Sequence, residues 1–427
     1  MSPRPPGVTI TGIGIVTGLG DDPSVFHTAL CESRSGLTGP VPDRPATEGL
    51  AAVGLVPPIR ATDVLPPTEA RLTDKFVLMG VLAADAALAD SGIAVGRDCD
   101  PEHAAVVVSN SSGGLETFEQ EVLRLAERDR RAASPYLLPG VLPNMATARV
   151  AIRHGIRGFS STISTACSGG AQAVAEGVRV IREGRADIVV CGGSEVPFSA
   201  TMVSSFGSAR ALAAPGGNPA EASRPFDTRR TGFVLSEGSA VLVLERTEHA
   251  EARGARGYAD LLGWGMSTDA YHATGPRPDG SGAAAAVLQS LSDARVAPAD
   301  VDYVNAHATG TKNGDLAEAS ALRTVFGQHG PAVSSTKGAT GHLLSAAGAL
   351  EAAICALSVD SGLMPPTMNL DAPDPACGLD HVVDAPRKSD GMVAVSTSFA
   401  FGGHNVSLVL GPSSSRAATN PHTGEHR

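Results

Sequence analysis

Ser164-Thr165-Ala166-Cys167-Ser168-Gly169-Gly170 joins a stretch with β-strand character to one with helical character. Upstream, residues 158–163 predict the buried end of a strand. Downstream, residues 171–182 are rich in alanine, valine and isoleucine at helical spacing. Cys167 is therefore expected at the N-terminus of a helix, where the helix dipole favours the thiolate. Taken alone, this context fits a nucleophile and a small cysteine packed under a helix equally well.

Segments of strand and helix character alternate on both sides of this stretch. The patterns predict helices over residues 21–35, 72–91, 116–131, 144–153, 248–254, 282–294, 314–326 and 342–358. They predict strands over residues 7–12, 103–108, 187–193, 238–245, 258–265, 301–305, 332–335, 392–398 and 406–410. This alternation is typical of the α/β class, with a mostly parallel sheet closed by an antiparallel pair at its C-terminal end. The second half of the chain repeats the element order of the first.

Composition restricts the class of protein. The chain has 427 residues, of which 42% are hydrophobic, and a formal net charge of -11, which disfavours general nucleic-acid binding. No apolar run is expected to span a membrane, and the N-terminal residues lack the apolar core of a signal peptide. The six cysteines are far apart and form no CxxC pair, so neither a metal site nor a disulfide framework is predicted. The expected compartment is a reducing cytoplasm.

Three further motifs contain residues that could take part in chemistry. Residues 305–311, Asn-Ala-His-Ala-Thr-Gly-Thr, place His307 at the end of a predicted strand. Residues 335–342 place Lys337 and His342 in a glycine-rich loop that opens a helix, and residues 398–405 form a glycine hairpin between two strands. A single histidine at a strand end is usually structural. Together, however, the motifs bring one cysteine and two histidines to loop ends of an α/β fold, where sites are commonly built.

These motifs occur in the order and spacing of a known family. Together with residues 224–227, Arg-Pro-Phe-Asp, and residues 232–238, they resemble β-ketoacyl-acyl carrier protein synthases of the elongating, type II kind, across residues 7–411. The resemblance implies the thiolase fold, in which two similar βα halves form one five-layered αβαβα unit. Residues 1–255 would be the half carrying the cysteine, and residues 256–411 the half carrying the histidines. Residues 412–427 are expected to be a disordered tail.

The resemblance also implies catalytic roles. Cys167 would hold the acyl chain, and its backbone N–H would form an oxyanion hole with that of Phe401. His307 and His342 would stabilise the enolate formed from a malonyl thioester. Lys337 matches the family's lysine near the histidines, and Glu351 the glutamate that balances it. Whether this pair acts directly or as a buried structural ion pair stays open.

Further residues match positions that contact the substrate or its carrier. The enzyme would need no cofactor of its own, because an acyl carrier protein supplies the phosphopantetheine arm. Thr309 and Thr311 would bind this arm, while Phe401 would gate the site with Phe399 and Ala400. Ser112 would line a roomy acyl pocket, unless it only satisfies a loop backbone group. Arg71 and Arg210 would dock the acidic carrier, unless they are solvated surface arginines with no role in docking.

Alternatives remain for the pathway and the assembly. The first is fatty-acid elongation; the second is a ketosynthase of a type II polyketide or other specialised pathway. The protein would be a homodimer, or a heterodimer with a cysteine-less chain-length partner, and would bind neither nucleic acid nor membrane. A non-catalytic partner, a thiolase and a priming synthase fit the motifs less well. The specialised role stays open because the chain departs from residues that are more common in the family. Ala308 and Ala400 replace glycines, and Gly338-Ala339 replaces Ser-Met.

Overall fold

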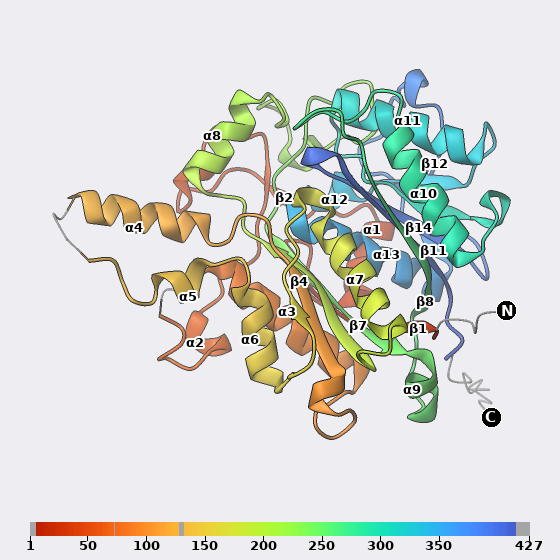
Figure 1. The fold of residues 1–427 in the computed structure, drawn as a ribbon. Helices are drawn as coiled ribbons and strands as arrows, with labels where there is room; N and C mark the ends of the chain where they lie inside the picture. Colours follow the sequence, from red (N-terminus) through yellow and green to blue (C-terminus); the bar gives the residue numbers. More distant parts are fainter. Residues whose placement is uncertain (1–5, 72, 128–131, 416–427) are drawn as a thin grey trace, which may run out of the picture.

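The computed structural model of the protein describes residues 6–71, 73–127 and 132–415. Its centre is a mixed sheet of eleven strands (Figure 1). The strands of the N-terminal half are β1 (Val8–Val16), β4 (Ala104–Ser109), β5 (Ser160–Ser161), β6 (Ile188–Glu195) and β7 (Gly238–Arg246). Those of the C-terminal half are β8 (Ala259–Thr268), β9 (Tyr303–Asn305), β10 (Ala332–Ser334), β12 (Asp380–His381), β14 (Ala394–Phe399) and β15 (His404–Pro412). Small separate ladders pair β2 (Leu37–Thr38) with β3 (Val53–Gly54) and β11 (Leu363–Met364) with β13 (Arg387–Lys388).

The strand pairing shows a duplicated topology. The N-terminal half has the order β1-β7-β6-β4-β5, and the C-terminal half has the corresponding order β8-β15-β14-β9-β10. In each half the first two pairings are antiparallel and the next two are parallel. A short antiparallel contact between β1 and β8 joins the two half-sheets. The expected duplication is confirmed, but the expected mostly parallel sheet is wrong, because antiparallel pairs occur in both halves.

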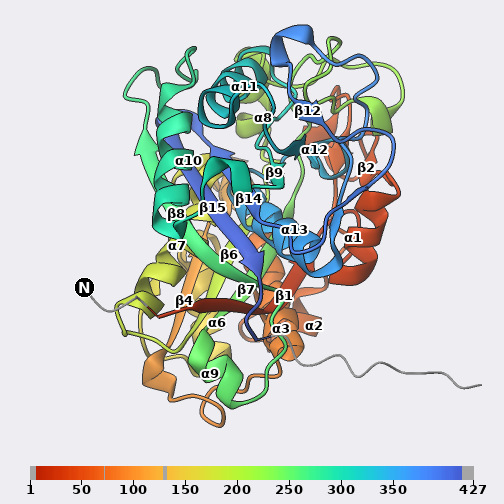
Figure 2. The same cartoon turned by 90° about the vertical axis from the view of Figure 1, so that its right-hand side faces the viewer.

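Helices cover the two half-sheets in layers (Figures 1 and 2). On the outside of the N-terminal half lie α3 (Lys75–Ser91) and α6 (Met145–His154), and on the outside of the C-terminal half α10 (Ser281–Ala294) and α11 (Lys312–Phe326). Between the half-sheets lie α7 (Gly169–Arg182) and α13 (Ala347–Ser361). This is the five-layered αβαβα arrangement of the thiolase fold. The remaining α-helices of the described residues are α1 (Pro23–Cys31), α2 (Ala61–Val64), α4 (Leu115–Glu127), α5 (Leu137–Val141), α8 (Ala200–Ser208), α9 (Thr247–Ala252) and α12 (Lys337–Thr340).

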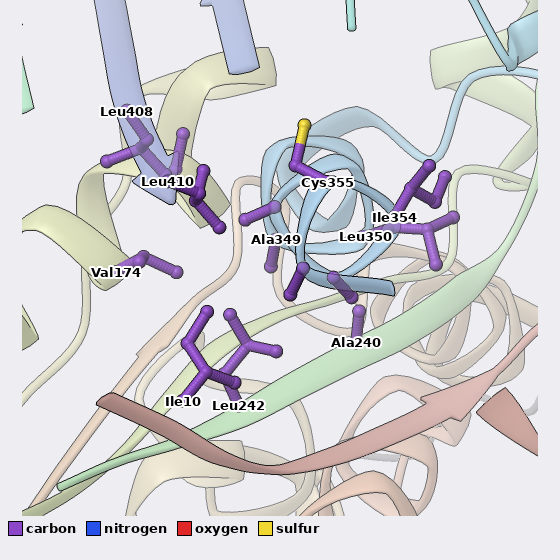
Figure 3. Packing of buried hydrophobic residues seen from close by; sticks show 14 of the residues in the cluster. Ile10, Val174, Ala240, Leu242, Ala349, Leu350, Ile354, Cys355, Leu408 and Leu410 are labelled. Carbon is purple, nitrogen blue, oxygen red and sulfur yellow. The ribbon is translucent and has the colours of Figure 1, made fainter. Parts of the chain in front are cut away.

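The largest hydrophobic core lies in the middle layer and draws on both halves. Figure 3 shows side chains converging from α7, α13, β1, β7 and β15. Residues Leu344–Ser361 have a mean hydropathy of 1.3, and by length and composition could cross a membrane, contrary to the sequence expectation. In this fold 89% of that stretch is buried, because α13 is enclosed between the half-sheets. Its apolar character is thus that of a core helix.

α7 and α13 pack backbone against backbone where they cross. A Cβ atom placed on Gly170 would lie 2.7 Å from the backbone N of Ala349, and one on Gly348 would lie 2.7 Å from the backbone N of Ala171. Side chains essentially never approach backbone atoms so closely, so only glycine fits at these two positions. The glycines therefore set how near the two halves lie to each other at their centre.

Two local expectations differ from the structure. The predicted buried strand before Cys167 is reduced to the short edge strand β5, whose Ser160 is exposed. At the C-terminus, Pro412 ends β15 and the Ser414 backbone N–H donates to Asp260 Oδ2 at 3.0 Å. Residues 412–415 are therefore ordered rather than part of a tail. Residues 416–427 lie outside the described residues.

Gly348→Ala is expected to destabilise the protein by about 1–3 kcal/mol, because the added methyl group overpacks the α7–α13 contact. Gly207→Ala is the matched control: Gly207 is also helical, but its added Cβ would meet open space. That variant should be stabilised by roughly 0.5–1 kcal/mol through helix propensity. Denaturant unfolding measures both changes, and equal stability of the two variants would contradict the packing argument.

Candidate active site

A strained turn presents Cys167. The short helix η3 (Ala166–Ser168) leads directly into α7, and Ala166 has the left-handed φ of 47° that side-chain-bearing residues rarely adopt. This turn places the cysteine at the N-terminus of α7, as expected from the sequence. The second half contains the same arrangement, because Leu344 has a φ of 47° in η6 (Leu344–Ala346), directly before α13.

One cavity of about 510 Å³ joins residues from both halves. It contains Cys167 from the N-terminal half and His307 and His342 from the C-terminal half. Sequence-predicted site residues that line it further are Thr309, Thr311, Phe399, Ala400, Phe401 and Arg210. Four others are absent from its lining: Lys337, Glu351, Ser112 and Arg71. The predicted nucleophile and both predicted enolate-binding histidines therefore line the same cavity.

The two histidine rings lie almost at right angles. Their centroids are 5.3 Å apart and their planes meet at 83°. The Nδ1 atoms of both rings are buried and have no hydrogen-bond partner among the described residues. Since the rings line the cavity, Nε2 is the nitrogen of each that is open to a substrate.

Backbone hydrogen bonds hold both histidines in place. The His342 N–H donates to the Val234 carbonyl at 2.8 Å, and the His307 N–H donates to Glu318 Oε1 at 2.9 Å. Glu318 also accepts from the Ala308 N–H at 2.7 Å. The sequence analysis missed this residue, although a carboxylate at helical spacing from Leu322 on an apolar face is a detectable signal.

Burial keeps the histidines neutral. Desolvation lowers the pKa of both His307 and His342 well below the ordinary value, and the nearby Lys337 charge lowers the pKa of each further. At neutral pH each imidazole therefore carries a single proton. A neutral ring protonated on Nε2 can donate one hydrogen bond to an oxygen in the cavity.

Lys337 and Glu351 form a fully buried ion pair next to the histidines. Burial raises the pKa of Glu351 to about 7, while the Lys337 ammonium group lowers it. Breaking such a pair leaves one buried charge unpaired, which is strongly destabilising. Neither residue lines the cavity, so their influence on the site is electrostatic.

The thiol of Cys167 is held in its neutral form. Burial raises its pKa to about 12, although Lys337 lowers it. The carboxylates of Glu195 and Glu351 raise it as well. The sequence argument considered only the helix dipole, and desolvation acts in the opposite direction.

In the loop at residues 399–403, which is expected to act as a gate, the residues with left-handed backbone angles are glycines. Gly402 and Gly403 have φ values of 84° and 74°, whereas Ala400 is extended with a φ of -131°. Phe401 packs against Phe206, with ring centroids 6.3 Å apart. Among the described residues, neither the Cys167 nor the Phe401 backbone N–H donates to a backbone carbonyl outside its own short helix. Both N–H groups are therefore candidates to bind an oxygen in the cavity.

Ser112 does not lie where the sequence placed it. Its hydroxyl donates to the buried carboxylate of Glu195 and lies 3.4 Å from the Gly113 carbonyl of the same loop, while its neighbour Ser111 lines the cavity. Of these two adjacent serines, the cavity lining therefore includes Ser111 and not Ser112.

The cations near the entrance differ in position. Arg210 lines the cavity, whereas Arg71 is exposed outside it. Lys312, at the start of α11, also lines the cavity and was missed in the sequence. None of these three side chains has an ion-pair partner in the described part of the chain. No group of three or more His, Cys, Asp or Glu residues is arranged for a metal ion among the described residues.

A thiolase fold with a cysteine at a helix N-terminus facing two neutral histidines defines a condensing enzyme that acts on thioesters. The family descriptions "Beta-ketoacyl synthase, N-terminal domain" and "Beta-ketoacyl synthase, C-terminal domain" match residues 6–250 and 258–371. The chain belongs to the β-ketoacyl synthase family and is an enzyme of the β-ketoacyl-acyl carrier protein synthase type.

Proteins similar to this chain include synthases named for 3-oxoacyl-[acyl-carrier-protein] and ketosynthases of polyketide-type systems. A Synechocystis protein named 3-oxoacyl-[acyl-carrier-protein] synthase 2 is 38% identical over 406 residues, which are 94% of this chain and 97% of that protein. The structure titled "The ishigamide ketosynthase/chain length factor" is 30% identical with a TM-score of 0.88 and covers 96% of this chain and 100% of that one. AntDE:AntF, a type II polyketide ketosynthase with an acyl carrier protein, is 29% identical with a TM-score of 0.87 over 96% and 100% of the two chains.

Lys337→Met is expected to shift the pH profile of Cys167 alkylation by iodoacetamide to higher pH. Lys337 lowers the pKa of Cys167, so loss of its charge raises that pKa and leaves less thiolate at any pH below it. A shift of one pH unit corresponds to about 1.4 kcal/mol. Lys337→Arg keeps the charge and should retain the wild-type profile. A lower melting temperature with an unchanged profile would make the ion pair purely structural.

Proposed function

We propose that this enzyme catalyses the decarboxylative Claisen condensation of an acyl chain on Cys167 with malonyl-acyl carrier protein in fatty-acid elongation. The product is a β-ketoacyl-acyl carrier protein. The observation that carries the proposal is the single cavity shared by Cys167, His307 and His342. The name of the Synechocystis relative supports the fatty-acid pathway.

The first half-reaction loads the nucleophile. The Cys167 sulfur attacks the carbonyl carbon of an acyl thioester, a new carbon–sulfur bond forms, and the bond to the carrier's sulfur breaks. The backbone N–H groups of Cys167 and Phe401 stabilise the intermediate oxyanion. Because the resting thiol is neutral, its proton departs with the phosphopantetheine thiol.

The second half-reaction forms the carbon–carbon bond. Loss of CO₂ from the malonyl group leaves its electron pair in an enolate, whose oxygen accepts hydrogen bonds from Nε2 of His307 and His342. The enolate carbon attacks the acyl carbonyl on Cys167, and the carbon–sulfur bond breaks. Cys167 leaves as a thiolate and takes a proton from water, which regenerates the neutral thiol. A low dielectric around the neutral rings strengthens these hydrogen bonds.

The remaining cavity residues would bind and gate the substrate. Thr309 and Thr311, whose hydroxyls lie 3.2 Å apart, would hold the phosphopantetheine arm supplied by the carrier. Phe401, with Phe399 and Ala400, would gate access to the sulfur. At the entrance, Arg210 and Lys312, with Arg71 further out, would attract the acidic carrier despite the enzyme's net negative charge.

A second candidate is the ketosynthase of a type II polyketide or other specialised pathway. It is favoured by the likeness to the ishigamide and AntDE ketosynthases. Either enzyme would act in the cytoplasm. Products analysed with malonyl-carrier as the only extender separate the two, because fatty-acid elongation requires reduction after each round whereas a polyketide synthase extends unreduced chains.

The protein would act as a homodimer, or with a cysteine-less partner in the specialised role. Helices α4 and α5 project from the body of the molecule (Figure 1). Their exposed apolar side chains form a surface suited to a second subunit: Phe118, Val122, Leu123, Leu138 and Leu142. Burial of this surface in a dimer would remove it from water.

Cys167→Ala should abolish acyl-enzyme formation and condensation but keep malonyl decarboxylation, because both histidines remain. His307→Ala should keep acyl-enzyme formation but block condensation, with decarboxylation lowered by roughly 10²–10³-fold through loss of an enolate donor. His154→Ala, on α6 away from the cavity, serves as the control. Mass spectrometry follows the acyl adduct and CO₂ release follows decarboxylation; a stable adduct on another residue contradicts the assignment.

Charge reversal at Arg210 or Lys312 should raise KM for acyl-carrier substrates about fivefold, the worth of one exposed charge pair, and leave small thioesters unaffected. Arg71→Glu tests the outer position in the same way. Arg295→Glu is the control, since Arg295 is exposed at the end of α10 remote from the cavity. A residue whose reversal leaves the carrier KM unchanged does not belong to the docking surface.

A further inference from the structure

The two halves present two equivalent turns but only one nucleophile. In the first, Ala166 with its left-handed φ precedes Cys167 and α7. In the second, Leu344 with the same φ precedes Ser345 and α13. Ser345 therefore occupies in the second half the position that Cys167 occupies in the first. Its hydroxyl is fully buried and donates to Glu195 Oε2 at 2.7 Å.

Glu195 is a fully buried carboxylate at the end of β6. Besides Ser345, it accepts from the Ser111 backbone N–H at 2.9 Å, from Asn110 Nδ2 at 3.3 Å and from the Ser112 hydroxyl. None of these donors is charged. A carboxylate without a cation is retained in a protein interior only when several donors satisfy its oxygens, so this cluster is built around Glu195.

The cluster connects two walls of the cavity. Ser111 and Leu344 both line the cavity with Cys167. Glu195 binds the same Ser111 through its backbone, together with Asn110, Ser112 and Ser345, which are direct neighbours of Ser111 or Leu344 in sequence. One carboxylate therefore ties the loop at residues 110–113 to the turn before α13, and a residue of each segment lines the cavity together with Cys167.

We propose that Glu195 is a positioning residue that sets which acyl chains fit beside Cys167, by clamping the loop at residues 110–113 to η6. The proposal deepens the proposed function and rests on it for the identity of the acyl substrate. It also gives Ser112 a role. Ser112 does not line the cavity, and it affects the choice of acyl chain through its hydrogen bond to Glu195 rather than by contact with the chain.

Glu195→Gln tests the clamp at nearly constant volume. Whichever way the amide lies, its NH₂ group faces a donor, either the Ser111 N–H or the Asn110 side-chain amide, so one connection is broken. Reaction of Cys167 with N-alkylmaleimides from ethyl to dodecyl reports the cavity shape without any natural substrate. The dodecyl-to-ethyl rate ratio should rise by about tenfold, the scale on which a pocket discriminates chain size.

With carrier thioesters of increasing chain length, acylation of Glu195→Gln should also shift in favour of long chains, seen as a lower KM for those chains. The kcat for malonyl decarboxylation should stay unchanged. Ser345→Ala and Ser112→Ala each remove one donor and should move the maleimide ratio in the same direction, which keeps the test decisive if Glu195→Gln does not fold. Glu245→Gln is the matched control: Glu245 is equally buried on β7 but pairs with Arg253 and His249 outside the cavity. It should lower stability without changing the ratio.

A ratio that stays constant in all three cluster variants, or reaction rates that fall equally for every chain length, would overturn the proposal. If the native enzyme accepts no acyl group from any carrier thioester while the maleimide ratio still shifts, the proposed function fails and the clamp stands.

Discussion

The contact between α7 and α13 is the constraint on which the rest of the structure depends. Gly170 and Gly348 let the two backbones touch, so no side chain separates the halves at this level. Because each helix begins at a strained turn, the same contact fixes how Cys167 lies relative to the turn before α13. The site can therefore take its nucleophile from one half and its histidines from the other.

The charges buried beside Cys167 and the histidines are those of three carboxylates, Glu195, Glu318 and Glu351, and the Lys337 ammonium group, whereas Arg210 and Lys312 line the cavity with exposed side chains. With this balance the site favours neutral groups, namely a thiol and two uncharged imidazoles. Catalysis then depends on hydrogen bonds that act when negative charge develops on the substrate, in surroundings where such bonds are strong.

Much of this arrangement could be predicted from sequence, because the three motifs lie where predicted strands end, and such loop ends commonly form sites in α/β folds. That placement and the family resemblance of the motifs predicted that Cys167, His307 and His342 meet, and all three line one cavity. Pairing partners are set by tertiary contacts, which is why the share of antiparallel strands was underestimated. Local pattern also does not determine which of two adjacent loop serines faces a cavity, and Ser112 was misplaced for that reason. Glu195 has no local signature, since its donors come from distant segments.

The enclosure of α13 has a consequence for how the chain is made. This helix is made after the whole first half, yet it covers the inner face of strands β1 and β7 of that half (Figure 3). Until it arrives, the first half exposes an apolar sheet face, and the helix itself is apolar enough to aggregate. The two halves therefore complete their shared core together, later in synthesis than in a protein whose domains complete one at a time.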